Sequence, residues 1–226
     1  MSGATLIGVD GRRRCAWCTV SAQYTAYHDT EWGFPVAEDR RLFEKLSLEG
    51  FQAGLSWRTI LAKRDRFRTV FHHFEIDRIA RFGAREVERL LQDPGIVRHR
   101  GKIEATIRNA RALVALRREG GSLAALAWGT VGGTPRVNRR RRLADVPAAT
   151  PESEALSRAL RARGFAFVGP TTMQAFQQAV GMVNDHLVGC PRHAACAAAA
   201  RRFRPPAGLD SRPEIREERA KRVTRE

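Results

Sequence analysis

Hydrophobic residues in this chain recur mostly three or four positions apart, and the strict alternation typical of β-strands is nearly absent. The spacing predicts an all-α fold. Helices are expected over residues 38–49, 53–65, 84–92, 102–118, 151–163 and 171–182. The fifth is the best delimited, because Thr150 suits an N-cap, Pro151 suits the first helical position and Gly164 suits the C-terminal end.

The first predicted helix carries a carboxylate in its apolar stripe. Leu42, Leu46, Glu49 and Ala53 lie on one face, so Glu49 points toward the core. A buried, unpaired charge is costly, which suggests a purpose for it. Four aromatic residues, Tyr24, Tyr27, Trp32 and Trp57, lie close by in sequence. One interpretation is a pocket that combines an acid with aromatic rings; the other is a helix break at Gly50 that leaves Glu49 in solvent.

The net charge of +16 narrows the class of partner, whereas the hydrophobic content of 43% is ordinary for a globular protein. A strongly basic chain favours a polyanion, most often nucleic acid and less often an acidic membrane surface. Nearly all the basic residues are arginines and alanine is abundant, a mixture that GC-rich codon usage also produces. Some of the excess charge therefore need not contact a partner.

Three regions are expected along the chain: a flexible basic extension over residues 1–14, one domain over 15–196, and a basic, mobile tail over 197–226. Within the domain, residues 129–142 form a Gly-rich loop that ends in four arginines. The sequence shows neither an apolar leader nor a membrane-spanning run. These features predict a soluble, cytoplasmic protein that does not associate with membranes.

A short connector between two predicted helices is a candidate DNA contact. Residues 94–97 form a tight turn that includes Gly95, and Arg98, Arg100 and Lys102 follow it. The start of the second helix offers backbone N–H groups and a positive dipole end, which bind phosphate without reading sequence. The alternative is an ordinary connector with a solvated basic face.

Cysteine and histidine residues allow more than one metal site. His186 and Cys190 lie one helical turn apart, and together with Cys15 and His28 they would form a closed Cys2His2 tetrahedron. An all-cysteine set is the rival, and buried thiols without metal are a third reading. That rival set is Cys15, Cys18, Cys190 and Cys196. Four protein ligands would leave no open position for water, so such a site would be structural.

Five strings in this order give the chain a close resemblance to a known family: YHDTEWG (27–33), LEGFQAGLSW (48–57), GIVRHRGKI (95–103), RGFAFVGPT (163–171) and GMVNDHLVGC (181–190). The chain resembles the 3-methyladenine DNA glycosylase I family of the helix–hairpin–helix superfamily. The resemblance implies a two-lobed, all-α glycosylase domain over 15–196 with its hairpin near 94–102. It also implies a monomer that acts on alkylated double-stranded DNA.

The resemblance also assigns residues. It implies a structural zinc on Cys15, His28, His186 and Cys190, a base pocket at Tyr24, Tyr27, Trp32, Glu49 and Trp57, and a DNA-binding hairpin from Gly95 to Lys102. Three departures remain: the chain ends match no motif, Phe51 stands where a polar residue is expected, and Cys18 and Cys196 add thiols near the metal.

The chemistry fits this assignment. Methylation at N3 makes adenine cationic and labile, so the enzyme mainly has to flip the base out and hold it against a carboxylate and aromatic faces. Glu49 is the predicted catalytic residue, acting as a binder of the base or orienting a water. Leu55 is either a wedge that fills the gap in the duplex or a plain core leucine. The substrate is expected to be 3-methyladenine, with 3-methylguanine as an extension; the alternative is a non-catalytic, zinc-stabilised DNA-binding module.

Overall fold

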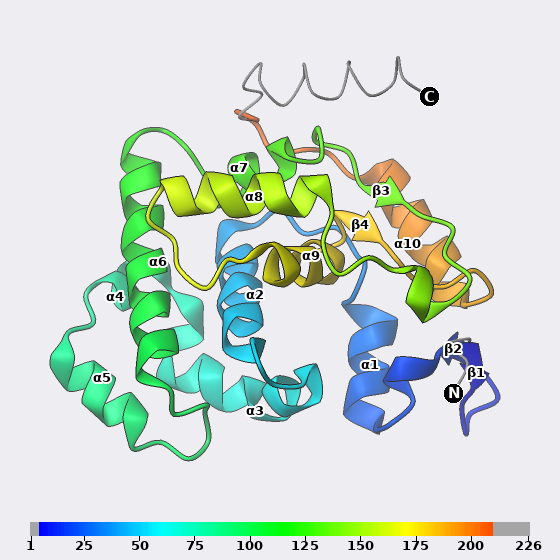
Figure 1. Cartoon of the computed structure of the whole chain (residues 1–226), viewed down its shortest axis with the longest axis horizontal. Coiled ribbons are helices and arrows are strands. Elements are labelled where there is room, and N and C mark those ends of the chain that lie inside the picture. Colours follow the sequence, from blue (N-terminus) through cyan, green and yellow to red (C-terminus); the bar gives the residue numbers. More distant parts are fainter. Residues whose placement is uncertain (1–4, 210–226) are drawn as a thin grey trace.

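The computed structural model describes residues 5–209, and these form a mostly helical protein (Figure 1). The helices are α1 (Ala22–Thr30), α2 (Asp39–Gln52), α3 (Trp57–Val70), α4 (Ile76–Ala80), α5 (Ala84–Leu91), α6 (Arg100–Arg118), α7 (Leu123–Gly129), α8 (Pro151–Ala162), α9 (Pro170–Ala179) and α10 (Pro191–Arg202). The strands are β1 (Thr5–Ile7) and β2 (Arg13–Cys15), which pair antiparallel, and β3 (Arg136–Val137) and β4 (Val183–Asn184), which pair parallel. The predicted helical class is confirmed, with two minimal sheets added.

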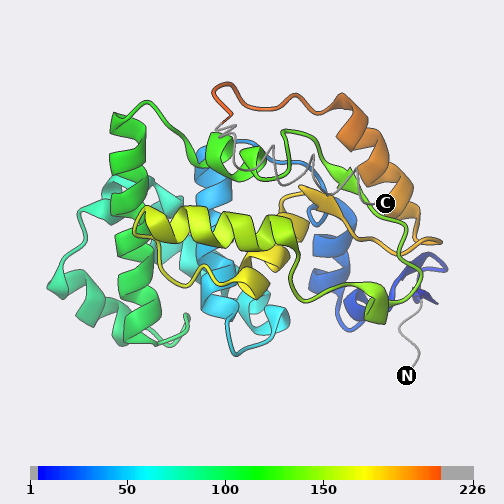
Figure 2. The same ribbon diagram turned by 45° about the horizontal axis from the view of Figure 1, so that its top comes forward.

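Helix α2 occupies the centre of the molecule. It contacts α3, α6, α7 and α9. Helices α4, α5 and α6 lie toward one end, and α1, α10 and the β1–β2 hairpin lie toward the other, an arrangement that Figures 1 and 2 both show. Within residues 5–209, no helix combines the length and the apolar character that a membrane crossing needs.

Local sequence explains most helix boundaries. The N-cap of α8 is as predicted, since the Thr150 hydroxyl accepts a hydrogen bond from the backbone N–H of Ser153 at 3.2 Å. Helix α2 does not break at Gly50 but continues to Gln52. Helix α3 begins later than residue 53, because Gly54 adopts a φ of +77° in a turn and Ser56 then caps the helix.

The expected flexible extension is wrong for the part that the structure describes. Residues 5–15 form a hairpin, and Arg14 at its second strand is buried. Its guanidinium pairs with Asp10 at 2.6 Å and with Asp29 of α1 at 2.9 Å. The sequence could not reveal this anchor, because Asp29 lies on another element. Residues 1–4 lie outside the described part of the chain.

The predicted tail also begins too early. Helix α10 runs to Arg202, past the expected boundary at residue 196. Directly after it, the ring of Phe203 stacks on Trp128 at a centroid distance of 4.1 Å. Trp128 is fully buried, and its indole N–H donates to the Val36 carbonyl at 2.9 Å. The chain beyond α10 therefore covers the core; residues 210–226 lie outside the described range.

We predict that Phe203→Ala lowers the free energy of unfolding by about 1–2 kcal/mol, because it removes a stacked ring and exposes part of Trp128. Urea denaturation followed by tryptophan fluorescence measures this loss. Arg202→Ala is the control, since Arg202 is exposed at the end of α10, directly before Phe203. Equal stability of the two variants would contradict the packing role of Phe203.

Candidate functional site

A cavity of about 200 Å³ opens between α1, the C-terminal part of α2, the start of α3 and α9, with residues near 143–146 and 185–187 completing its wall. The structure brings all five predicted pocket residues to its wall, namely Tyr24, Tyr27, Trp32, Glu49 and Trp57. Clefts that hold drug-sized ligands measure roughly 300–1,000 Å³, so this one suits a smaller, flat ligand.

Glu49 is buried without a partner for one of its oxygens. The side chain is 4% exposed, and Oε2 accepts no hydrogen bond from the protein. Burial raises the pKa of Glu49 to about 8, an effect that the charge of Lys45 opposes. A carboxylate left unsatisfied at the wall of a cavity can form its missing interaction with a ligand. The interpretation of Glu49 as a solvated residue beside a helix break is therefore wrong.

Aromatic rings surround the carboxylate. The ring centroids of Trp17 lie 5.0 Å from both Tyr24 and Trp32, and those of Tyr27 and Trp57 lie 5.2 Å apart. Burial raises the pKa of Tyr24 to about 12, with Glu49 adding to the shift, and raises the pKa of Tyr27 as well. Both phenols therefore stay neutral at physiological pH. The site offers one acid and several π faces, which together attract a cation.

Eight lining residues escaped the sequence analysis, among them Trp17 and Gln52, and one predicted contact lies outside the pocket. Trp17 could have been found from its place beside Cys15, and Gln52 from its position one turn after Glu49 on α2. Leu55 does not line the pocket. It lies in the turn between α2 and α3 and is 44% exposed, so the reading of Leu55 as a plain core leucine is wrong.

A second cluster joins the two ends of the fold. Cys15 and His28 come from the N-terminal part and His186 and Cys190 from the loop before α10; all four are buried. Their ligand atoms lie within 4.8 Å of one another. This set could hold a metal ion, whereas the other two cysteines lie outside it. The thiol of Cys18 donates to the Cys15 carbonyl, and that of Cys196 faces the Trp32 carbonyl.

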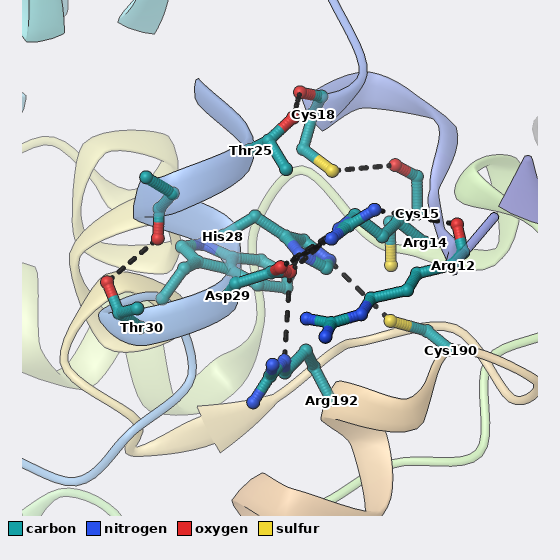
Figure 3. A network of polar contacts seen from close by, with 12 residues as sticks. Arg12, Arg14, Cys15, Cys18, Thr25, His28, Asp29, Thr30, Cys190 and Arg192 are labelled. Atoms are coloured by element: carbon teal, nitrogen blue, oxygen red, sulfur yellow. Dashed lines mark hydrogen bonds and ion pairs between the residues drawn. The ribbon is translucent and has the colours of Figure 1, made fainter. Parts of the chain in front are cut away.

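Neighbouring residues orient both histidines. Nδ1 of His28 lies 2.8 Å from the carboxylate of Asp29, which the buried Arg14 holds in turn (Figure 3). Nε2 of His186 lies 3.0 Å from the carbonyl oxygen of Trp32. Each histidine therefore directs its other ring nitrogen into the cluster, an arrangement common around metal ligands. Trp32 also connects the cluster with the pocket.

The connector between α5 and α6 is attached to α3. Lys63 donates to the Pro94 carbonyl at 2.6 Å, and Arg66 pairs with Asp93 at 2.6 Å. Asp93 also accepts a hydrogen bond from the backbone N–H of Gly95 at 2.8 Å. The predicted Arg98 and Arg100 are exposed, and Arg100 pairs with Glu88. Both are placed where a polyanion can reach them.

Lys102 departs from its predicted role. It is buried, and its ammonium donates to the carbonyls of Phe51 and Ala53 at the C-terminal end of α2. The predicted DNA contact through this ammonium is therefore wrong. Lys102 instead satisfies helix-terminal carbonyls and connects the start of α6 with the turn that carries Leu55.

Comparison with known proteins places the chain. The family model described as Methyladenine glycosylase matches residues 17–193. The chain belongs to this family. DNA-3-methyladenine glycosylase 1 of Escherichia coli (strain K12) is 48% identical over 177 residues, which cover 78% of this chain and 95% of the relative.

Solved structures agree with the sequence match. A crystal structure of 3-methyladenine DNA glycosylase I is 50% identical with a TM-score of 0.78, and the match covers 79% of this chain and 98% of that one. A structure of 3-methyladenine DNA glycosylase I from Staphylococcus aureus, which addresses recognition of 3-methyladenine, is 35% identical with a TM-score of 0.76. This match covers 79% of this chain and 95% of that one. The shared fold therefore extends over most of the described chain.

We predict that Lys102→Met lowers the free energy of unfolding by about 1–3 kcal/mol, because it leaves two carbonyls of α2 without their donor. Chemical denaturation measures this loss, and Arg98→Met, at an exposed position of the same connector, is the control with unchanged stability. Should Lys102→Met keep full stability and weaken only DNA binding, the ammonium would contact DNA after all.

Proposed function

We propose that this protein is a base-excision repair glycosylase that hydrolyses the N-glycosidic bond of 3-methyladenine in alkylated double-stranded DNA. We extend the proposal to 3-methylguanine, which carries the same methyl-induced positive charge. Membership of the methyladenine glycosylase family supports it. The observation that carries it is the unpartnered oxygen of Glu49 beside an aromatic cavity of about 200 Å³.

The site suits a labile, cationic base. Methylation at N3 places a positive charge on the purine and weakens its bond to the sugar, so the base leaves as a neutral molecule. Water adds to C1′ of the sugar, and the released proton passes to solvent or to Glu49. Anionic Glu49 stabilises the bound cation, while the rings of Tyr27 and Trp57 add cation–π contacts of roughly 0.5–2 kcal/mol each. Binding of the flipped base is thus the main task of the pocket.

DNA is bound, in this proposal, by the surface formed by the α5–α6 connector and the α2–α3 turn. The connector acts as the hairpin of a two-lobed helix–hairpin–helix glycosylase: backbone groups near Gly95 and the exposed Arg98 and Arg100 contact phosphates. Leu55 projects from the neighbouring turn and fills the space that the flipped nucleotide leaves. Its exposure supports this role, because an apolar side chain gains from burial between bases.

Zinc is the metal that the cluster fits best. Zn–S bonds of about 2.3 Å and Zn–N bonds of about 2.0–2.1 Å in a tetrahedron give N–N edges of about 3.3 Å and N–S edges of about 3.5 Å. His28 Nε2 and His186 Nδ1 lie 3.2 Å apart, and Cys190 Sγ lies 3.6 Å from His28 Nε2. Cys15 Sγ lies 3.8 Å from His186 Nδ1. With four protein ligands, the ion would stabilise the fold and leave the chemistry to the pocket.

We further propose that the enzyme is monofunctional and acts as a monomer in the cytoplasm. A lyase would need a free amine to attack the sugar. Lys102, the lysine nearest the start of α6, has its ammonium committed to two backbone carbonyls. It is thus unavailable as a nucleophile.

We predict that Glu49→Gln loses most excision, at least about tenfold at pH 8, because the amide cannot offset the charge of the bound base. Release of free 3-methyladenine from methylated duplex DNA measures this loss. The raised pKa of Glu49 also gives the wild type an acidic limb: excision falls as pH drops below about 8 and the carboxylate takes up a proton.

The controls for Glu49→Gln separate enzyme from binding module. The variant should remain folded. As the pH rises from 6 to 9, the variant should also lose less stability than the wild type. In the wild type the pKa of Glu49 is higher in the folded than in the unfolded state, so the unfolded state releases this proton at lower pH and is favoured as the pH rises. If neither protein releases bases from alkylated DNA, the chain is a non-catalytic DNA-binding module.

We predict that the purified protein holds about one equivalent of zinc by elemental analysis, and that chelation lowers its melting temperature with activity falling only as the fold is lost. Cys190→Ser should lose the metal. The matched control is Cys196→Ser, which changes a buried thiol outside the four-residue set and should keep it. Full zinc content in Cys190→Ser would contradict the assignment.

A further inference from the structure

Lys45 is a buried cation that none of the roles above uses. It lies on the central helix α2 one turn before Glu49, with 7% of its surface exposed. Lysine is rarely buried without a charged partner. It does not belong to the wall of the pocket, but it contacts residues that do.

The contacts of Lys45 hold its ammonium next to the pocket. Nζ lies 3.2 Å from a carboxylate oxygen of Glu31, 4.4 Å from the ring centroid of Tyr27 and 5.5 Å from that of Trp57. Burial lowers the pKa of Lys45, while the charges of Glu31 and Glu49 act in the opposite direction. The ring faces also favour the charged form.

A count of charges shows that Glu31 does not need Lys45. Arg64 of α3 already pairs with the same carboxylate oxygen at 2.7 Å. Although burial opposes ionisation of Glu31, the two cations lower its pKa, so it carries one negative charge. When Lys45 is protonated, Lys45 and Arg64 together carry one positive charge more than Glu31, and an ionised Glu49 one turn along the same helix would balance it.

The other groups around Glu49 cannot supply this balance. Tyr24 and Tyr27 of α1 are neutral phenols with raised pKa values. Asp185, which also lines the pocket, is an acid that accepts hydrogen bonds from Asn138 and Gln178 and pairs with Arg140 at 3.7 Å. Among the described residues, Lys45 is the cation whose charge lowers the pKa of Glu49.

We propose that Lys45 is a positioning residue that favours the anionic form of Glu49 for the incoming cationic base, acting through space without occupying the carboxylate. The proposal rests on the function proposed above. Glu31 holds the ammonium by direct contact, so Oε2 of Glu49 keeps its lone pairs free for a ligand. A direct ion pair would have neutralised Glu49 and closed the site. Because both side chains are buried, a charge one helical turn away still acts strongly.

The decisive measurement is the titration of Glu49 itself, followed by carbon NMR of its side-chain carboxyl group and assigned by its loss in Glu49→Gln. In Lys45→Met, which keeps the length and removes the charge, the midpoint should rise by at least about one pH unit. Lys45→Arg should restore the wild-type midpoint. Excision should follow: at pH 7, Lys45→Met should be about tenfold slower, since one pH unit is a tenfold change in the ionised fraction.

Arg40→Met is the matched control, because it removes the same charge from an exposed position of α2 where solvent screens it. It should leave the titration of Glu49 unchanged. A folded Lys45→Met whose Glu49 midpoint equals that of the wild type would overturn the proposal. So would a stability loss with an unshifted pH–rate profile, since that marks a merely structural lysine.

A reciprocal measurement covers the case in which Lys45→Met does not fold. If the two groups are coupled, Glu49→Gln must lower the pKa of the Lys45 ammonium, followed by nitrogen NMR, by the amount that Lys45 lowers the pKa of Glu49. An unchanged Lys45 titration refutes the coupling. Both NMR titrations are independent of catalysis, so a protein that releases no bases would refute the proposed function and still leave the role of Lys45 decidable.

Discussion

Enclosure of helix α2 is the constraint on which the rest of the structure depends. Helices α3, α6, α7 and α9 surround it, so a polar side chain on its inner faces has to find its partner within the protein. Lys45 finds Glu31, whereas one oxygen of Glu49 finds no partner. Five buried polar side-chain atoms of the described residues lack a hydrogen-bond partner, and the Glu49 oxygen is the one among them that belongs to a carboxylate at the wall of the cavity. Binding of a cationic base would give this carboxylate oxygen the partner that it lacks within the protein.

The pocket depends on distant parts of the chain for its shape. Trp32 at its wall has its carbonyl beside His186, and Trp17 lies two residues after Cys15, so the Cys/His cluster holds two of the rings in place. Arg14 and Asp29 support the cluster from outside. The Cys/His cluster and the pocket share supporting residues and therefore gain rigidity together, which suits a site that has to discriminate between similar bases.

The surface proposed to bind DNA also depends on side chains that connect separate elements of the fold. Lys102 connects α6 with the end of α2, and Lys63 and Arg66 connect α3 with the turn before α6. Three basic residues thus stabilise contacts between elements of the fold, and exposed arginines remain to attract phosphate. The basic residues of the chain are therefore divided between those that hold elements of the fold together and those whose charge remains available at the surface, and composition alone does not separate the two groups.

Local patterns in the sequence determined the helical class, the caps of α8 and the placement of an acid on the inner face of α2, because helix periodicity and capping depend on residues only a few positions apart. The five strings that resemble the glycosylase family pointed to the five pocket residues and the four Cys/His residues that the structure brings together. Tertiary structure alone decided the rest. Arg14 is buried because Asp29 faces it, Phe203 packs because Trp128 lies beneath it, and Lys102 turns inward because the carbonyls of α2 end beside it. In each case the deciding partner is far away in sequence, and the two residues come close together only when the chain has folded.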